Sequence, residues 1–379
     1  MENEIKLVEV KTKAQRRTFV DYPNKLYQDE PNFVPAFYGD DMADWDPRKN
    51  PAFSYCEARS WLAYRDGKVV GRIGAILSHR ANEKWGTKRM RFSQVDFIDD
   101  PAVSDALFQK VESWAKEKGM DELQGPLGFC DMDREGMLVE GFDKRGQFIT
   151  YYNHPYYIEH MKRLGFEKDA DRVEYLLPIP AVDDPKMLRI KRISDHILAK
   201  GKYHEVQVKN RLAYKPWIRQ AFELVNKAYG ELYGTVDLGK DQIEKYADKF
   251  IPLIEPEFCS LVADENETLV AFGVMGMSMA EAMQKSRGRL FPTGWIHVLK
   301  SLQKNDTVDM FLIAVDPALQ GVGLNSIVMT HLWEGAVKRG IVNAETGPML
   351  EMNEKILSQW KALTVIPHKR RRCFVKKIG

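Results

Sequence analysis

The most informative hydrophobic pattern lies in the last third of the chain. Residues 307–315 are an apolar, β-branched run that predicts a buried strand. Pro317 cannot continue a strand ladder, and Gly321 and Gly323 allow a sharp turn in which the backbone comes close to a ligand. Apolar residues then repeat at helical spacing up to Gly340, where a C-cap belongs. The pattern predicts a strand, a glycine turn and a helix N-terminus whose unpaired N–H groups suit a phosphate.

The same periodicities predict alternating strands and helices along the rest of the chain. We expect strands at 5–10, 61–65, 68–78, 91–98, 122–124, 173–177, 205–208, 260–263, 268–275, 342–345 and 370–377. We expect helices at 14–27, 103–115, 154–164, 187–200, 214–229, 241–250 and 353–363, and a helical insertion at 280–302. The proline-rich segment 178–185 is the best linker, so two domains are predicted, 1–180 and 181–379.

The two halves resemble repeats of one another. A helix that ends at Gly119 and a later Gly125-Pro126 correspond to a helix that ends at Gly340 and a later Gly347-Pro348. The offset is 221 residues at the helix end and 222 residues at the Gly-Pro pair. The matching order of predicted elements indicates duplication of one domain.

Composition narrows the classes of function. The chain has 379 residues, 44% hydrophobic content and a formal net charge of +2, which predicts no nucleic-acid or membrane partner. The four cysteines are far apart and form no C-x-x-C pair, so neither a disulfide framework nor a metal site is expected. The charged residues 1–6 lack the apolar core of a signal peptide, and we therefore expect a cytoplasmic protein.

The glycine turn is not a standard nucleotide-binding loop, because neither G-x-x-x-x-G-K-[ST] nor G-x-G-x-x-G occurs there. It resembles the Q/R-x-x-G-x-G/A loop of the GNAT N-acetyltransferase superfamily. Gln320 and Gly323 occupy the first two signature positions, and Asn325 replaces the final Gly or Ala. A tight strand-to-helix turn of any α/β protein is the alternative reading of the same residues.

The resemblance implies an α/β fold of two tandem GNAT-like domains, each a mixed, mostly antiparallel sheet flanked by helices. It also implies that acetyl-CoA or another acyl-CoA binds the second domain. In such proteins an Asn and, seven residues later, a Tyr lie on the helix after the next strand, and Asn353 and Trp360 have that spacing here. The implied cofactor-binding residues are Leu312, Ile313, Ala314, Val315, Gln320, Gly321, Val322, Gly323, Leu324, Asn325, Asn353 and Trp360.

The expected reaction is direct attack of an amine on the thioester, which requires a base and an acid. Asp309 on the strand is a candidate base, and its alternative reading is an outward-facing charge. Tyr233, or Tyr229, is a candidate acid because an indole at position 360 cannot deliver a proton. Glu345 and Glu351 are candidates to hold a cationic amine.

The corresponding segment of the first half has no glycine and carries Asp99, Asp100 and Asp105 where a diphosphate would lie. Like charges would repel it, so we expect the first domain to have lost the cofactor. The acceptor is expected to be a small-molecule or peptide amine. A homodimer is one expected assembly of the chain. Two alternatives stay open: an aminoacyl- or long-chain acyl-transferring enzyme, and a non-catalytic CoA-binding or scaffold protein.

Overall fold

The computed structural model describes residues 4–379, with the backbone alone at 361 and 362. It divides into two compact units that do not follow a single cut of the chain. Unit 1 contains the residues up to Val173 together with Met279–Ser301 and His368–Gly379. Unit 2 contains Glu174–Ser278 and Leu302–Pro367. The predicted domain limits, 1–180 and 181–379, remain a prediction, because this division into units does not test them.

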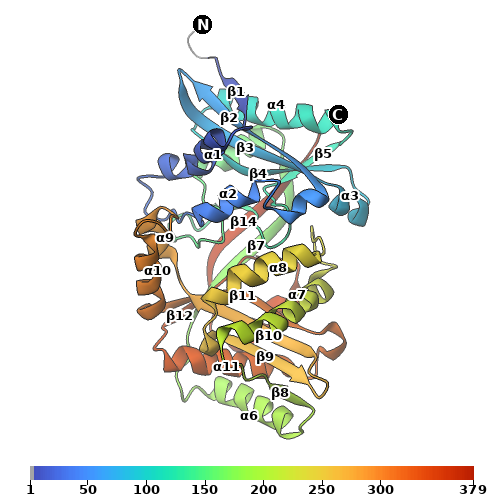
Figure 1. Ribbon diagram of the computed structural model, residues 1–379, viewed down its shortest axis with the longest axis vertical. Helices are drawn as coiled ribbons and strands as arrows, with labels where there is room; N and C mark the ends of the chain where they lie inside the picture. The colour runs from blue at the N-terminus through green and yellow to red at the C-terminus, as the bar shows by residue number, and fades with distance from the viewer. Residues whose placement is uncertain (1–3) are drawn as a thin grey trace. The chain divides into compact units, whose positions relative to one another are not determined.

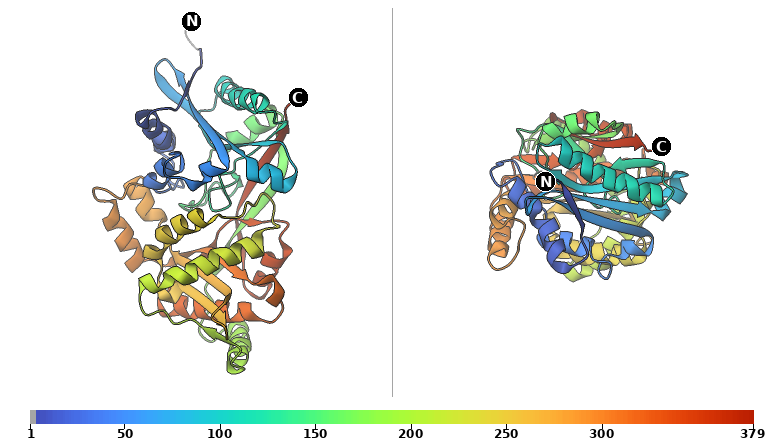
Figure 2. Two further views of the ribbon diagram at one scale, coloured as in Figure 1. Left: turned by 45° about the vertical axis from the view of Figure 1, so that its right-hand side comes forward. Right: turned by 90° about the horizontal axis from the view of Figure 1, so that it is seen from above.

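Unit 1 is built on a mixed sheet with the strand order β1-β2-β3-β4-β5-β14, and β6 also pairs with β14. Helix α4 covers one face of this sheet and α1 covers the other (Figures 1 and 2). The strands are β1 (Lys6–Glu9), β2 (Cys56–Arg65), β3 (Lys68–Ser78), β4 (Arg89–Phe97), β5 (Glu122–Gly125), β6 (Met137–Glu140) and β14 (Ile366–Lys377). The helices are α1 (Lys13–Leu26), α2 (Tyr38–Asp44), α3 (His79–Trp85), α4 (Pro101–Glu117), α5 (Tyr156–Arg163), α9 (Ala280–Ser286) and α10 (Gly294–Gln303).

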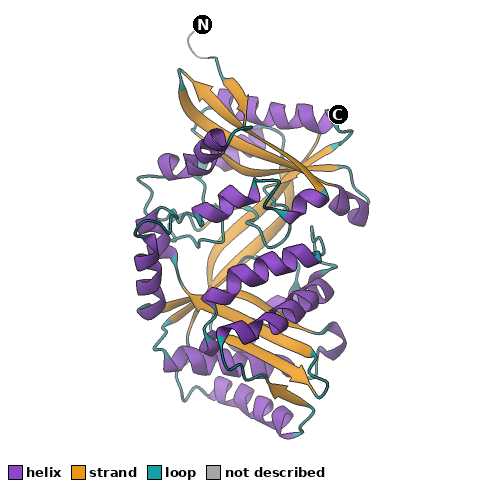
Figure 3. Cartoon of the chain, viewed as in Figure 1, coloured by secondary structure: helices purple, strands orange, loops and turns teal. Residues whose placement is uncertain are grey.

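Unit 2 repeats this plan with the strand order β7-β12-β11-β10-β9-β8, in which β7 contributes its residues from Glu174 onward. Helices α6 and α11 lie on one side of the sheet, and α7 and α8 lie on the other (Figure 3). The strands are β7 (Glu167–Pro178), β8 (Tyr203–Glu205), β9 (Cys259–Asp264), β10 (Leu269–Met277), β11 (Thr307–Val315), β12 (Asn343–Thr346) and β13 (Met349–Leu350). The helices are α6 (Pro185–Ala199), α7 (Lys215–Tyr229), α8 (Lys240–Phe250), α11 (Leu324–Lys338) and α12 (Glu354–Ser358).

The two sheets share one unusual pairing pattern. In each, a parallel pair, β4 with β5 or β11 with β12, is followed by an antiparallel strand. That following strand is β14 in unit 1, from the C-terminal end of the chain, and β7 in unit 2. Each half of the sequence therefore gives its last strand to the sheet built by the other half.

Close packing of α11 on its sheet depends on glycine. A Cβ on Gly273 of β10 would lie 2.4 Å from Val328, and one on Gly335 of α11 would lie 2.0 Å from the carbonyl oxygen of Glu257. Val328 and its neighbours Ile327 and Leu332 are buried in the apolar core of unit 2. The missing side chains let α11 lie close to β10, which positions the N-terminal end of the helix beside the end of β11.

Several predicted elements are corrected by the structure. The strand expected at 205–208 is β8, which ends at Glu205. The helical insertion expected at 280–302 is two helices, α9 and α10, because Gly288 adopts a left-handed conformation and Pro292 follows it. Helices α2 and α3 and strand β6 were not predicted, since their short segments carry no extended periodicity. The hairpin turn at Asp66 and Gly67 is confirmed, and both residues have positive φ.

Among the residues that the structure describes, none of the helices combines the length and apolar content needed to span a bilayer. Within the same residues, no group of three or more His, Cys, Asp or Glu side chains is arranged to hold a metal ion.

Candidate functional site

The parallel strands of unit 2 separate at one point. Their register runs from Thr307 opposite Asn343 to Met310 opposite Thr346, and the amide of Gly347 then donates to the carbonyl of Met310 at 3.0 Å. Strand β12 ends there, whereas β11 continues for five more residues, to Val315. Among the described residues, no strand pairs with β11 beyond Phe311 on the side that β12 occupied, and this side of residues 312–315 is called the free edge.

A β-bulge marks the point of separation. On the β10 side, Val274 pairs with Leu312 and Met275 pairs with Met310, so Phe311 is an extra residue in β11. A bulge of this kind bends the strand and redirects its backbone groups. Phe311 packs close to Gly276, where a Cβ would lie 3.0 Å from the ring.

The free edge presents backbone groups to a ligand. The amide of Asp316, next after the strand, donates to Val270 on β10 at 2.8 Å. Because successive strand residues alternate in direction, Ile313 and Val315 direct their N–H and C=O groups away from β10, and of these the carbonyl of Ile313 already accepts from the Tyr229 hydroxyl. An extended molecule with amide groups could pair with this edge as an added strand would.

Tyr229 reaches the same edge from the end of α7. Its hydroxyl donates a hydrogen bond to the carbonyl of Ile313. Burial raises the pKa of Tyr229 to about 12, so the hydroxyl remains protonated at neutral pH. The sequence indicated Tyr229 only as an alternative candidate acid, and no local sequence pattern predicts its contact with β11.

The loop after β11 is held in a fixed conformation. It begins with the short 3₁₀ helix η5 (Pro317–Leu319), which Asp316 caps while also pairing with Lys227 at 2.7 Å. Gly321 and Gly323 have φ values of 87° and 96°, which only glycine adopts without strain. Gly323 is the N-cap of α11.

This loop leaves backbone donors available at the start of α11. The amide of Ser326 donates to the carbonyl of Gly323 at 2.8 Å. Within residues 4–379, the structure gives no hydrogen-bond acceptor to the amides of Gly321, Gly323, Leu324 or Asn325. The positive end of the 15-residue helix α11 adds to their attraction for an anion. The residues present thus fit the diphosphate of a coenzyme A thioester.

Two side chains of the predicted loop point elsewhere. The Asn325 amide lies 3.4 Å from the Gln359 side-chain oxygen and 3.4 Å from the Met329 sulfur. The Gln320 side chain accepts a hydrogen bond from Lys355 at 3.1 Å. Gln320 and Val322 are exposed, and their backbones belong to the turn.

Asp309 and Glu345 are adjacent partners in the register of β11 and β12. Their neighbours Val308, Met310 and Ala344 belong to the apolar core that α11 covers. Because strand side chains alternate, both carboxylates point to the opposite face of the sheet, the face of α7 and α8. Both residues are buried, with Asp309 at 0% exposure. The structure thus places Asp309, the predicted base, opposite Glu345, a predicted amine-binding residue, in the paired strands.

The remaining predicted residues are placed as follows. Tyr233 is half-buried in the loop between α7 and α8, and Glu351 is exposed. Asn353 caps α12 by accepting from the amide of Ile356 at 3.3 Å. Trp360 lies in the core of unit 2 at 4% exposure and donates to the sulfur of Met349 at 3.2 Å. The functional roles of all four stay predictions.

The corresponding helix start in unit 1 is already filled by protein groups. Asp100 caps α4 by accepting from Ala102 at 2.8 Å and pairs with Arg65 at 2.7 Å. Asp105 pairs with Arg163 at 2.8 Å. This geometry supports the expectation that unit 1 does not bind the cofactor, which stays a prediction.

Asp99, the third carboxylate of that segment, belongs to a Ser–His–Asp chain. His160 lies 2.8 Å from the Ser104 hydroxyl and 2.9 Å from the Asp99 carboxylate. Ser104 is fully buried, donates to the carbonyl of Pro101 and accepts from Arg163. A hydroxyl held in this way cannot reach a substrate, so the arrangement is structural.

The end of β4 in unit 1, which corresponds to the free edge of β11, is covered by aromatic side chains. Tyr156 donates to the carbonyl of Phe97 at 2.5 Å, and the Tyr157 hydroxyl accepts from the amide of Phe97 at 2.8 Å. Tyr157 also contacts the Tyr27 hydroxyl at 2.9 Å, and Tyr27 donates to Asp96. These hydroxyls satisfy the backbone groups that an added strand would need.

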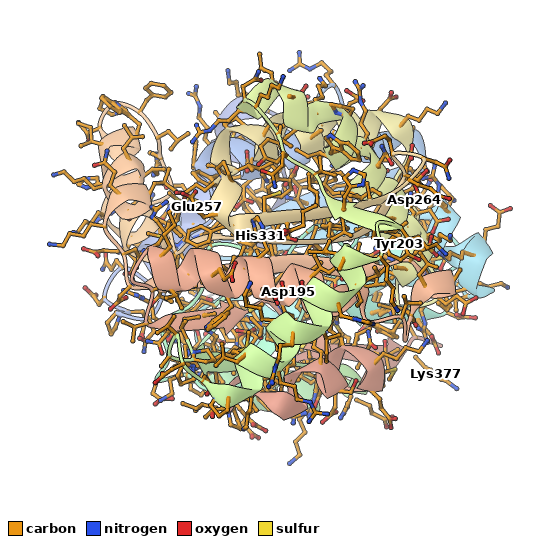
Figure 4. The ribbon with its side chains drawn as sticks, turned by 90° about the horizontal axis from the view of Figure 1, so that it is seen from below. Asp195, Tyr203, Glu257, Asp264, His331 and Lys377 are labelled. Atoms are coloured by element: carbon orange, nitrogen blue, oxygen red, sulfur yellow. The ribbon has the colours of Figure 1, made fainter. Side chains whose placement is uncertain are left out.

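A charged contact of His331 holds the middle of α11 against neighbouring segments. His331, labelled in Figure 4, lies 3.0 Å from the Glu205 carboxylate and 2.9 Å from the carbonyl of Pro256. Burial lowers the pKa of His331, but these two acceptors outweigh it and raise the pKa above its usual value. The protonated ring has two N–H donors and satisfies both acceptors.

Comparison with solved structures identifies the architecture. The chain is similar to a tandem GNAT protein from the clavulanic acid biosynthesis pathway, with a TM-score of 0.57, 13% identity and 99% of both chains covered. The chain has the tandem GNAT fold. A GCN5-related N-acetyltransferase from Sphaerobacter thermophilus matches with a TM-score of 0.51 and 11% identity, over 98% of this chain and 96% of that one. The predicted tandem GNAT fold is therefore confirmed.

Two curated proteins are similar in sequence over most of this chain. Protein YghO of Escherichia coli (strain K12) is 26% identical over 372 residues, which cover 97% of this chain and 94% of that protein. The bacterial ceramide synthase of Caulobacter vibrioides (strain NA1000 / CB15N) is 23% identical over 303 residues, or 79% and 77% of the two chains. No family model matches the chain.

Proposed function

We propose that the protein is an acyl-CoA-dependent N-acyltransferase whose active site lies in unit 2. The observation that carries this proposal is the free edge of β11 beside the unpaired amides at the start of α11. One feature suits the amide-containing arm of coenzyme A and the other suits its diphosphate. The tandem GNAT fold of the chain supports the same reading.

In this proposal Leu312, Ile313, Ala314 and Val315 would hold the amide-containing arm of acyl-CoA, and the turn from Gln320 to Asn325 would hold its diphosphate. The outward amide at Ile313 or Val315 is the donor available to the thioester carbonyl oxygen. A donor held in place there stabilises negative charge that develops on that oxygen. Asn353 and Trp360 are further candidates for contact with acyl-CoA.

Asp309 and Glu345 carry the base role in this proposal. The pair attracts a cationic amine, and one carboxylate accepts the proton that the ammonium must lose. The amine nitrogen then forms the new bond to the acyl carbon as the carbon–sulfur bond breaks. Acyl-CoA supplies the activated thioester. Tyr233 is the candidate to return a proton to the departing sulfur.

One relative supports a long-chain lipid amine as a second acceptor class. A ceramide is an amide of a fatty acid and a long-chain amino alcohol, and one relative is named a bacterial ceramide synthase. We therefore place long-chain acyl transfer to such an amine beside acetyl transfer to a small or peptide amine.

The test is a matrix of donors and acceptors. The purified chain is incubated with acetyl-, octanoyl- or palmitoyl-CoA and with an amino acid, a polyamine, a peptide N-terminus or a long-chain amino alcohol. Thiol release and the mass of the amide product are recorded. We expect one donor–acceptor combination to give amide and free thiol in equal amounts.

Tight acyl-CoA binding without turnover in any combination would instead support the non-catalytic CoA-binding alternative. Absence of both binding and turnover would overturn the proposal altogether.

A further inference from the structure

An apolar surface with a basic rim lies at α10 and the turn before it. Large apolar side chains are exposed there in a short stretch of sequence. They are Leu290, Phe291, Trp295, Ile296 and Leu299, and the name apolar patch is used here for these five residues. Phe291 is 79% exposed, although burial of one such ring is ordinarily favourable.

The geometry of α10 separates this patch from the buried side of the helix. Gly294, Val298 and Ser301 face inward, whereas Trp295 and Leu299 share the outer face four residues apart. A Cβ on Gly294 would lie 1.7 Å from the carbonyl oxygen of Arg289, so the turn before the helix is tightly closed. Helices α9 and α10 are the orange helices at the left of both views in Figure 2.

The polar end of Trp295 is already satisfied. Its indole N–H donates to the carbonyl of Pro292 at 3.0 Å, and its backbone amide donates to Leu290 at 2.8 Å. The outer surface of the indole is therefore apolar, with its one donor turned back to the chain. Indole rings of this kind favour the boundary between lipid headgroups and acyl chains.

Basic residues outnumber acidic ones in the segment that carries the patch. Residues 282–305 contain Lys285, Arg287, Arg289, Lys300 and Lys304 but neither Asp nor Glu. Lys285 is paired with Glu281, and Arg289 is paired with Asp21 at 2.7 Å. Arg287 and Lys300 are exposed beside the patch. The net charge of +2 for the whole chain averages over its surface and conceals this local excess.

We infer that this surface docks on an anionic lipid bilayer. Apolar side chains on one helix face with lysine and arginine at the margin are the pattern of helices that lie in the membrane interface. Anionic headgroups attract the basic rim, and the exposed rings enter the upper acyl region. The core of a protein–protein interface is also depleted in charged residues, but a protein partner would need an acidic surface of its own to match this rim. The inference holds independently of the proposed acyl transfer.

The experiment is co-sedimentation of the full chain with vesicles. Neutral phosphatidylcholine vesicles are compared with vesicles in which about a third of the lipid is phosphatidylglycerol. The wild type is expected to sediment with the anionic vesicles and to be released by high salt. The variant Phe291→Ser/Trp295→Ser/Leu299→Ser is expected to lose at least fivefold of this binding. The variant Arg287→Glu/Lys300→Glu is expected to lose the preference for anionic lipid.

Two control variants alter equally exposed residues elsewhere. Leu212→Ser removes another 79% exposed apolar side chain, and Lys116→Glu reverses another exposed charge. Both are expected to bind as the wild type does, and thermal melting checks that every variant is folded. Absence of the wild type from both vesicle pellets, or equal binding by the apolar variant and Leu212→Ser, would overturn the inference. Loss of a dimer in the apolar variant, without vesicle binding by the wild type, would assign the surface to a second copy of the chain instead.

Discussion

Asp309 and Glu345 are register partners one residue before the parallel pair of β11 and β12 ends. Their side chains share the face opposite the apolar core of unit 2. In the proposed function this pair of carboxylates draws in an ammonium group and takes its proton. This relationship links two residues 36 positions apart in the sequence.

The first prediction concerns this pair. Asp309→Asn and Glu345→Gln keep the side-chain shape but remove the charge that would accept a proton. We expect kcat to fall by about 100-fold in at least one variant, the lower end of the contribution of a general base. The KM for acyl-CoA is expected to change little, because neither residue lies on the cofactor loop. Steady-state kinetics with the best donor and acceptor measure both quantities.

Glu265→Gln is the matched control, since Glu265 is exposed in the turn between β9 and β10 and its substitution removes an equal charge. Wild-type kcat in both Asp309→Asn and Glu345→Gln would remove this pair from the mechanism.

The second prediction concerns the loop before α11. Val322 is 46% exposed in that loop, so Val322→Glu adds a carboxylate without the backbone strain that any side chain at Gly323 would cause. We expect the acyl-CoA Kd to rise at least tenfold, because the new charge repels the diphosphate. Ligand at a hundred times its Kd stabilises a protein by about 2.7 kcal/mol, so a thermal shift with and without acyl-CoA reports the loss.

Val322→Gln has a similar size without the charge and is expected to bind nearly as the wild type. Val342→Glu places the same charge at another exposed valine. Equal weakening by Val322→Glu and Val342→Glu would mean that the loop is not the diphosphate site.

The third prediction separates a structural tyrosine from a catalytic one. The buried Tyr229 hydroxyl donates to Ile313, and its pKa of about 12 makes it a poor acid at neutral pH. Tyr229→Phe should therefore lower the free energy of unfolding by about 1 kcal/mol, the typical net value of one hydrogen bond. Its kcat should stay within about threefold of the wild type, because the acid role is assigned elsewhere. Urea unfolding and steady-state kinetics test the two parts.

Tyr233→Phe is measured beside it and is expected to give the larger loss of kcat. The reverse order, with a loss near 100-fold in Tyr229→Phe, would make Tyr229 the acid.

The fourth prediction concerns pH and His331. The pKa of His331 in the folded protein is raised above its ordinary value of 6.5. A raised pKa means that the folded state binds the proton more tightly than the unfolded chain does. The stabilisation is therefore complete below pH 6.5 and is lost as the pH rises through the folded-state pKa. His331→Gln should destabilise the protein more at pH 6 than at pH 9, as measured by urea unfolding.

Glu205→Gln removes the carboxylate that contributes to the shift and should reduce the same pH dependence. An equal cost of His331→Gln at both pH values would show that the ring contributes through packing alone.

The local sequence determined much of the type and order of the secondary-structure elements. Residues 307–315 form β11 with the predicted bounds, and Gly321 and Gly323 form the predicted turn into α11. These features follow from neighbouring residues, because strand apolarity, proline exclusion and positive φ act over a few positions. The duplicated order of elements also follows from local periodicity, repeated once.

Tertiary structure decided which strands and side chains meet. The local patterns of β7 and β14 predict strands but not their pairing partners. Each of these strands completes the sheet of the other half, and such pairing joins residues that are far apart in the sequence. The contact of Tyr229 with Ile313 and the pairing of Asp309 with Glu345 arise only when α7 and β12 pack beside β11. The exposed patch on α10 is likewise a tertiary fact, because periodicity shows that a helix has an apolar face but not whether another element covers it.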